Sequence, residues 1–199
     1  KPDYRPTALS DKAMDWFAAR GITTDVLIRN RISMERVWMP QIEDEVTAIT
    51  YPYYKGGEVV NVKYRDGQKN FRQFAGAQKV FYKYDDIADV TIICEGEMDA
   101  LSLEVAGFRN AISVPDGAPA PDAKHFENKF EFLDDERLDS VKQWILAVDA
   151  DEPGRKLEDE LSRRLGREKC MRILWPDDCK DANEVLVKHG AEALHHLIE

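Results

Sequence analysis

Short apolar runs that end abruptly in acidic residues mark the second half of the chain. Residues 91–94 (Thr-Ile-Ile-Cys) are followed by Glu95, and residues 144–148 (Trp-Ile-Leu-Ala-Val) are followed by Asp149 and Asp151. Four or five apolar, partly β-branched residues between polar turn residues are typical of strands in a parallel sheet that is buried on both faces. Functional residues gather at the carboxyl ends of such strands, so these carboxylates are the first candidates for chemistry.

Strand and helix patterns alternate from residue 87 to the C-terminus. Besides the two strands above, the pattern predicts strands at 111–114 and 171–175, and helices at 98–105, at 122–141, after Pro153 and from Ala182. Alternating β and α units predict an α/β domain, with a central parallel sheet of about four strands and helices on both faces.

The N-terminal part has a different texture. Its first forty residues are mostly helical in character, with Ser10 as a plausible N-cap and a second short helix at 24–31. From Trp38 to Tyr84 the pattern is β, and residues 46–54 and 59–65 flank a Gly-Gly turn, with a further strand at 71–74. We therefore expect an N-terminal α+β basic subdomain at 1–86, followed by the α/β domain at 87–199.

Composition places few other limits on the chain. Of its 199 residues 43% are hydrophobic and 33% are charged, as in ordinary globular proteins. No apolar run approaches the length of a membrane span, and no secretory pattern is present, so we expect an intracellular protein without a membrane partner. Residue 1 is Lys rather than Met, which suggests a piece of a longer protein.

The cysteines give no metal signature. There are three, without a CxxC pair and without a Cys/His grouping at the spacing of a zinc site. We expect reduced thiols and no zinc in this part of the protein.

Charge is distributed unevenly. The net charge of −10 argues weakly against nucleic-acid binding, but residues 55–83 hold seven Lys and Arg against two acidic residues, a local charge of +5. A basic segment beside an acidic site suits a polyanionic substrate.

The spacing of the acidic residues suggests a particular chemistry. Asp149 and Asp151 lie two apart on an extended chain and therefore point to the same side. Clustered carboxylates repel one another unless a hard divalent cation lies between them, and Mg²⁺ is the usual ion beside phosphates. The local prediction is a metal-assisted phosphoryl-transfer site.

Three motifs of the second half occur in one order within one α/β unit: residues 95–102 (EGEMDALS), 149–155 (DADEPGR) and 180–184 (KDANE). Together they resemble the Toprim domain shared by primases, topoisomerases and some nucleases. The subtype resembles the primase half of phage-type primase-helicases, a family that includes plant organellar Twinkle. Residues 61–65 and 69–72 resemble the basic subdomain that precedes Toprim in these enzymes.

The resemblance implies roles for individual residues. Glu95 would be the general acid/base and a metal ligand, and Asp149 and Asp151 would bind Mg²⁺ or Mn²⁺, with Asp99 and Asp181 as further candidate ligands. The residues implied to hold nucleoside triphosphates or template are Lys63, Arg65, Lys69 and Arg72, with Arg155 as an additional candidate.

As a whole, the resemblance implies a DNA primase core that synthesises short RNA primers from ribonucleoside triphosphates on single-stranded DNA. Complete enzymes of this family carry a zinc-binding domain upstream and a helicase downstream, and they act in a bacterial or phage-infected cytoplasm or in an organelle. The alternative is a catalytically silent Toprim scaffold that binds single-stranded DNA. A Toprim nuclease or topoisomerase lacks support, because no Tyr nucleophile with its own domain is recognisable.

Several of these residues also fit plain structural roles. Asp181 with Glu184 would make a capping box, which is the better interpretation of that pair, and Asp151 could cap the helix after Pro153. An acid at Asp99, in a first helical turn, is favoured by the helix dipole in any case. The basic strands could be a hydrated sheet face.

Overall fold

The computed structural model describes residues 3–120 and 126–199. By its internal contacts the chain divides into two compact units, Lys1–Gln78 and Lys79–Glu199. Each unit is described by itself below.

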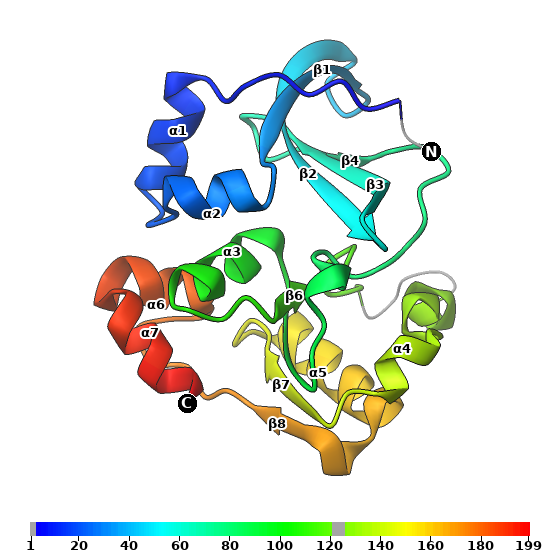
Figure 1. Ribbon diagram of the computed structural model, residues 1–199, viewed down its shortest axis with the longest axis vertical. Helices are drawn as coiled ribbons and strands as arrows, with labels where there is room; N and C mark the ends of the chain where they lie inside the picture. The colour runs from blue at the N-terminus through cyan, green and yellow to red at the C-terminus, as the bar shows by residue number, and fades with distance from the viewer. Residues whose placement is uncertain (1–2, 121–125) are drawn as a thin grey trace. The chain divides into compact units, whose positions relative to one another are not determined.

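The first unit has two helices and an antiparallel sheet (Figure 1). Its elements are α1 (Asp11–Ala18), α2 (Thr24–Arg29), β1 (Ser33–Met39), β2 (Asp44–Lys55), β3 (Glu58–Arg65) and β4 (Phe71–Gln73), and the strands are neighbours in chain order. Ser10 caps α1 by accepting a hydrogen bond from the Ala13 amide at 3.2 Å, as its sequence position predicts. One side of the sheet has a core that includes Met39, Ala48 and Val62.

The predicted hairpin is present, and its turn explains the glycine pair. Gly56 and Gly57 both have positive φ, at 63° and 77°, as a two-residue hairpin turn of type I′ requires. Lys55 pairs with Glu58 directly across this turn. The turn sets the pairing at the start of β3, and a register shift between Tyr53 and Tyr54 sets the pairing of the rest of the strand, which carries two of the predicted phosphate-binding residues.

Strand β1 was not expected from the helical character of the first forty residues. It pairs with β2 along its whole length, from Ser33 opposite Thr50 to Met39 opposite Asp44. Local propensity is a weak guide to strands, because pairing and burial against a distant segment decide the outcome. Here that segment is β2, whose Ala48 packs with Met39.

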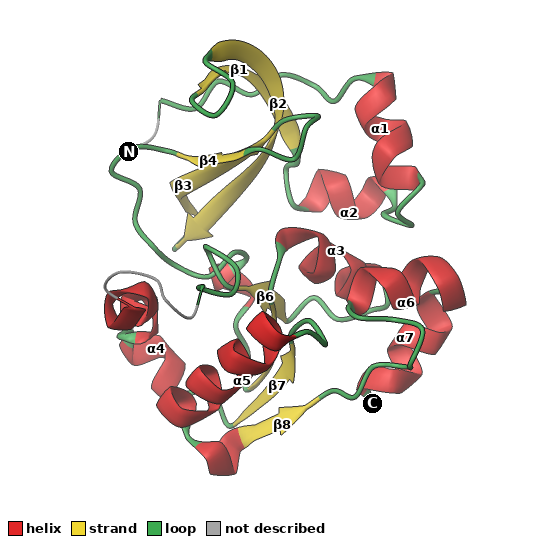
Figure 2. Ribbon diagram, turned by 180° about the vertical axis from the view of Figure 1, so that it is seen from behind, coloured by secondary structure: helices red, strands yellow, loops and turns green. Residues whose placement is uncertain are grey.

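The second unit is an α/β structure around a parallel sheet (Figure 2). Its elements are β5 (Val90–Cys94), α3 (Glu97–Val105), β6 (Ala111–Ser113), α4 (Glu136–Asp139), β7 (Gln143–Ala147), α5 (Glu152–Leu165), β8 (Cys170–Arg172), α6 (Ala182–His189) and α7 (Ala191–Ile198), with short 3₁₀ helices at Tyr84–Asp86, Phe126–Leu133 and Arg167–Lys169. The strand order is β6-β5-β7-β8, and all pairs are parallel.

The strand order explains why helices flank both faces of this sheet. The chain leaves β5 through α3 to reach β6 on one side, and it leaves β7 through α5 to reach β8 on the other side. Right-handed crossovers in opposite directions place their helices on opposite faces. Consistent with this, α3 packs with α6 and α7, whereas α5 lies on the viewer's side of the sheet in Figure 2.

The acidic residues follow directly after the buried parts of the two central strands. Ile92 and Ile93 are fully buried, and Cys94 lies opposite Ala147 in the parallel register of β5 and β7. Glu95 directly follows Cys94, and Asp149 follows Ala147 by two positions. Both carboxylates therefore leave the sheet at the same edge, as the sequence predicted.

Two helical segments differ from expectation. Instead of one helix at 122–141, the chain forms a 3₁₀ helix at Phe126–Leu133 and the short α4, while residues 121–125 lie outside the described range. The C-terminal helix divides at Gly190, whose φ of 89° ends α6. Among the described residues, no helix is both long and apolar enough to cross a membrane.

Residues 79–86, which the sequence pattern placed in the N-terminal subdomain, lie within the second unit. Tyr82 forms a bridge with Ser113, and the ammonium group of Lys83 lies 2.7 Å from a carboxylate oxygen of Glu104 and 2.9 Å from the carbonyl oxygen of Arg109. The side chains of Lys83 and Glu104 are both almost completely buried. The division of the chain into functional domains at 86/87 stays a prediction.

Candidate functional site

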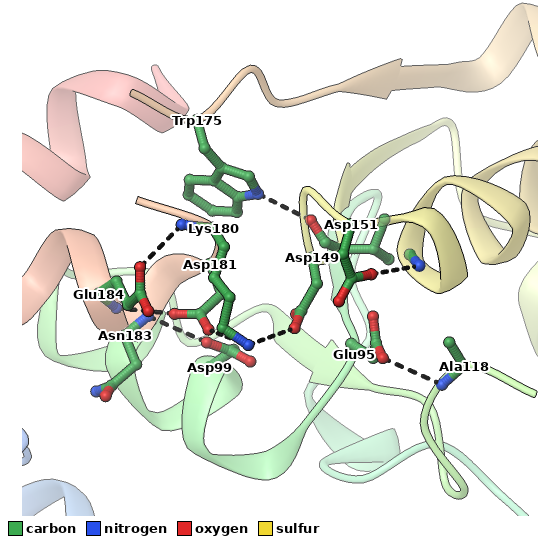
Figure 3. A network of polar contacts seen from close by, with 12 residues as sticks. Glu95, Asp99, Ala118, Asp149, Asp151, Trp175, Lys180, Asp181, Asn183 and Glu184 are labelled. Carbon is green, nitrogen blue, oxygen red and sulfur yellow. Dashed lines mark hydrogen bonds and ion pairs between the residues drawn. The ribbon is translucent and has the colours of Figure 1, made fainter. Parts of the chain in front are cut away.

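Glu95 lies at the end of β5 with its two carboxylate oxygens in different surroundings (Figure 3). Oε1 accepts a hydrogen bond from the Ala118 amide at 3.3 Å. Oε2 is buried and has no hydrogen-bond partner in the described part of the chain. Burial and the nearby charge of Asp149 raise the pKa of Glu95 to about 7. A group that is half protonated near neutral pH is suited to general acid/base chemistry.

Asp149 and Asp151 follow β7 but have different contacts. Asp151 is the N-cap of α5 and accepts a hydrogen bond from the Gly154 amide at 2.8 Å, so the capping role considered from the sequence is present. Oδ2 of Asp149 lies 3.3 Å from the ammonium group of Lys180. The two residues therefore share an edge of the sheet without sharing partners.

Among the described residues, Asp99, Asp149 and Asp181 form a close acidic cluster. One carboxylate oxygen of each lies within 4.8 Å of the other two. Burial, together with the charges of Asp181 and Asp149, raises the pKa of Asp99 well above its ordinary value. Burial and the charge of Asp181 likewise raise the pKa of Asp149. Three carboxylates held this close favour either a proton or a cation between them.

Two helix starts bring Asp99 and Asp181 to this cluster. Asp99 lies in the first turn of α3, and its Oδ1 accepts a hydrogen bond from the amide of Asn183, in the first turn of α6, at 3.0 Å. Asp181 caps α6 by accepting from the Glu184 amide at 2.8 Å. The Glu184 carboxylate accepts in turn from the amide of Lys180 at 3.0 Å, one residue before the usual capping-box position. Asp181 is thus both a cap and a member of the cluster.

Gly154 is a site residue whose role the sequence alone does not reveal. A Cβ atom added there would lie 2.0 Å from the carbonyl oxygen of Asp149, a contact that real Cβ atoms essentially never make. The first turn of α5 therefore packs directly against the backbone of Asp149. Only glycine permits this approach, although Gly154 stands in an otherwise ordinary helical position.

Further groups lie around the edge of the sheet that carries Glu95, Asp149 and Asp151, here called the acidic edge. They come from the segment before α6 and from the first turn of that helix. The indole Nε1 of Trp175 donates to the carbonyl oxygen of Val148 at 2.8 Å, and the amide of Ala150 donates to the carbonyl oxygen of Lys180 at 2.8 Å. Asn183 also donates through its side chain to the hydroxyl of Ser102 at 2.9 Å. Lys180 and Asn183 belong to the third sequence motif, but their contacts depend on packing that the motif does not show.

The basic residues of the first unit lie on two faces of its sheet. Lys63 lies opposite Gln73 and Arg65 opposite Phe71, whereas Arg72 lies opposite Tyr64. Directly opposed residues in an antiparallel pair share a face, and neighbours along a strand alternate. Lys63 and Arg65 therefore share a face, and Arg72 lies on the other.

The contacts of these bases agree with this division. The Arg65 guanidinium lies 4.4 Å from the ring centre of Trp16, and the Lys63 ammonium lies 5.2 Å from that of Phe71. A guanidinium nitrogen of Arg72 donates instead to the carbonyl oxygen of Trp38 at 2.7 Å. Lys69 is exposed in the turn before β4, with a φ of 67°. These residues remain predicted phosphate ligands; Lys63 and Arg65 share a face, and Lys63 is only 9% exposed there.

Arg155 belongs to the acidic edge of the second unit. It is exposed in the first turn of α5, and one guanidinium nitrogen lies 3.4 Å from the carbonyl oxygen of Ala150. A phosphate contact for Arg155 stays a prediction.

Comparisons with known proteins agree with this site. The profile of a family described as Toprim-like matches residues 92–186, which span all three motifs. The chain is 39% identical over 205 aligned positions to the chloroplastic/mitochondrial Twinkle homolog protein of Arabidopsis thaliana, and 39% identical over 205 positions to the primase homolog protein of the same plant. Each alignment covers 96% of this chain, which spans 28% and 59% of the lengths of the two relatives.

A solved structure shows the same fold. The primase fragment of the bacteriophage T7 primase-helicase protein superimposes with a TM-score of 0.74 at 24% identity, covering 98% of this chain and 74% of that chain. Residues 92–186 therefore belong to the Toprim-like family, in a chain that is homologous to plant Twinkle and primase homolog proteins and has the fold of a phage primase.

Proposed function

We propose that this chain is the nucleotidyl-transfer core of a DNA primase, which joins ribonucleoside triphosphates into short RNA primers on single-stranded DNA. The observation that carries the proposal is the convergence of Asp99, Asp149 and Asp181 within 4.8 Å beside Glu95, in a Toprim domain. The names of the plant relatives support it, and one of them is called a primase homolog.

The acidic residues fit a bound Mg²⁺ or Mn²⁺ ion. The donor atoms of the cluster are all oxygens, which hard divalent cations prefer. Burial disfavours the ionised forms of Asp99 and Asp149, and among the described residues Lys180 contacts Asp149 and Asp181. Asp99, Asp149 and Asp181 would hold the ion, which would neutralise the charge that develops on the transferred phosphoryl group.

The protein itself would supply positioning and proton transfer. The reaction joins a ribose 3′ oxygen to the α-phosphorus of a second nucleotide and releases pyrophosphate, so the 3′ hydroxyl must lose its proton. Oε2 of Glu95 would take that proton, because it is buried and the pKa of Glu95 is about 7. The Ala118 amide holds the other oxygen of Glu95 and fixes the orientation of the carboxylate.

The partners and location are proposed by the same reasoning. Single-stranded DNA and ribonucleoside triphosphates are polyanions, and Lys63 and Arg65 offer them two neighbouring positive charges on one sheet face. Because the chain spans only part of its relatives, a zinc-binding domain and a helicase in the same polypeptide belong to the proposal as well. The name of one relative, a chloroplastic/mitochondrial protein, supports a proposed chloroplast or mitochondrial location.

Primer synthesis with labelled ribonucleotides, single-stranded DNA and Mg²⁺ tests the proposal. We expect Glu95→Gln and Asp149→Asn to abolish synthesis without unfolding the chain, because each change is nearly isosteric and removes charge from a repulsive cluster. Glu152→Gln is the matched control: this carboxylate is exposed next to Asp151 and pairs with Lys156, so activity should persist. Binding of single-stranded DNA without any synthesis by the wild-type chain would favour the scaffold alternative instead.

A further inference from the structure

The segment before α6 and the last residue of that helix bring together three side chains that the proposed reaction does not use. Asp178, Cys179 and His189 each offer a ligand atom, and the three atoms lie within 4.8 Å of one another. Nε2 of His189 is 2.8 Å from Oδ2 of Asp178, and Sγ of Cys179 is 3.6 Å from Oδ1 of Asp178. The structure therefore collects an oxygen, a sulfur and a nitrogen donor at one place.

This donor set differs chemically from the carboxylate cluster. Thiolate sulfur and imidazole nitrogen suit Zn²⁺ and Co²⁺, whereas Mg²⁺ selects oxygen ligands. Three protein ligands with a water in the fourth position make a common tetrahedral arrangement for zinc. We propose that Asp178, Cys179 and His189 bind one Zn²⁺ or Co²⁺ ion, and that the Cys179 thiol releases its proton to solvent when the ion binds.

The surroundings of the three residues permit such an ion. Asp178 and His189 are exposed, whereas Cys179 is 6% exposed, so an ion would enter from solvent and meet the sulfur on its protein side. The ammonium group of Lys188 contacts the main-chain carbonyl oxygen of Asp178 and the Glu184 carboxylate, rather than the Asp178 carboxylate. The competing interpretation is a metal-free ion pair between Asp178 and His189.

A metal here would act on the segment that carries the acidic site. Lys180 and Asp181 directly follow Cys179, and His189 ends the helix that Asp181 caps. The ion would tie the two ends of residues 178–189 together and hold this segment in its folded position. Zn²⁺ or Co²⁺ should therefore stabilise the chain, since a ligand that binds only the folded state shifts the unfolding equilibrium.

Titration of the reduced full chain with Co²⁺ tests the site through the optical absorption of a thiolate–cobalt bond. We expect one equivalent to give this absorption, Zn²⁺ to displace it, and Zn²⁺ to raise the unfolding temperature. Cys179→Ser should abolish the absorption, and His189→Gln should weaken binding by at least roughly 10–100-fold, the effect known for loss of a supporting group at a metal site. Cys170→Ser and His196→Gln are matched controls outside the cluster and should bind normally.

The proposal fails if the folded wild-type chain shows no thiolate–cobalt absorption, or if Cys170→Ser removes it. It also fails if His189→Gln keeps the wild-type affinity for Co²⁺, because His189 would then be only the ion-pair partner of Asp178. This variant decides the matter even if Cys179→Ser does not fold. Asp149→Asn should leave the absorption unchanged, so the result is independent of primer synthesis. Loss of the absorption in that variant would mean that the thiolate site does not form independently of the carboxylate cluster, and would contradict the proposal as stated.

Discussion

Replacement of Gly154 by Ala tests how closely the first turn of α5 packs against the backbone of Asp149. The added methyl carbon would lie 2.0 Å from the carbonyl oxygen of Asp149, where real Cβ atoms stay beyond 3.0 Å. The two backbones must therefore separate by about 1 Å, because a main-chain carbonyl cannot rotate away as a side chain can. In a helix Ala is favoured over Gly by about 1 kcal/mol, but overpacking costs about 1–3 kcal/mol and occasionally more.

Because this overlap involves backbone on both sides, we place its cost at or above the upper end of that range, so the net loss of stability should be about 2 kcal/mol. For a unit of this size, that corresponds to a melting temperature lower by roughly 6–10 °C. Primer synthesis should fall further than stability, since a displacement of about 1 Å at a reacting group can cost roughly 100-fold in rate.

Thermal and urea unfolding of Gly154→Ala measure the effect on stability. Gly67→Ala is the control for the methyl group itself, because Gly67 has an ordinary φ and no atom within 4 Å of the added carbon. Gly154→Ala with the stability of Gly67→Ala or higher would refute the inferred contact between α5 and the Asp149 backbone.

Three further predictions concern charge. Glu95 is protonated more readily in the folded chain, with a pKa of about 7 against 4.5 when unfolded, so its contribution to stability is lost as pH rises through that window. In metal-free buffer Glu95→Gln should therefore be more stable than wild type at pH 7. A difference in unfolding free energy between the two that does not shrink toward pH 4.5 contradicts this. Lys83→Met should cost about 3–5 kcal/mol in urea unfolding because it removes the ammonium group that lies 2.7 Å from the buried Glu104 carboxylate, and adding Glu104→Gln should restore part of the loss. Lys63→Ala should reduce by about 0.7 the slope of log affinity for single-stranded DNA against log salt concentration, because one phosphate contact is lost. Equal slopes for Lys63→Ala and Lys55→Ala would count against a phosphate contact at Lys63.

The parallel sheet and the position of its first carboxylates could be predicted from the sequence. The central strands β5 and β7 are largely buried runs followed within two residues by an acidic residue, and parallel strands present their carboxyl ends at one edge. The observed pairing of Cys94 with Ala147 then brings Glu95 and Asp149 to that edge. Local patterns sufficed here because the strand period and the direction of the chain determine the geometry.

The composition of the tight cluster could not be read from local patterns. Asp99 and Asp181 start two different helices, and their approach depends on how α3 packs against α6, for which the sequence holds no periodic signal. Similarly, strand alternation predicts a shared face for Lys63 and Arg65, but the face of Arg72 depends on the register between β3 and β4. Tertiary packing and strand register decided both outcomes.

The contact between Lys180 and the cluster has a consequence for the acidic site when no divalent ion is bound. Its ammonium lies 3.3 Å from Asp149 and 3.6 Å from Asp181, so the chain carries its own exchangeable counterion at the acidic edge. A monovalent group on a flexible, half-exposed stem can leave when a divalent ion arrives and return when it departs. With this counterion beside Asp149 and Asp181, the acidic residues need not move apart when no divalent ion is bound, so the arrangement that would receive the ion is kept.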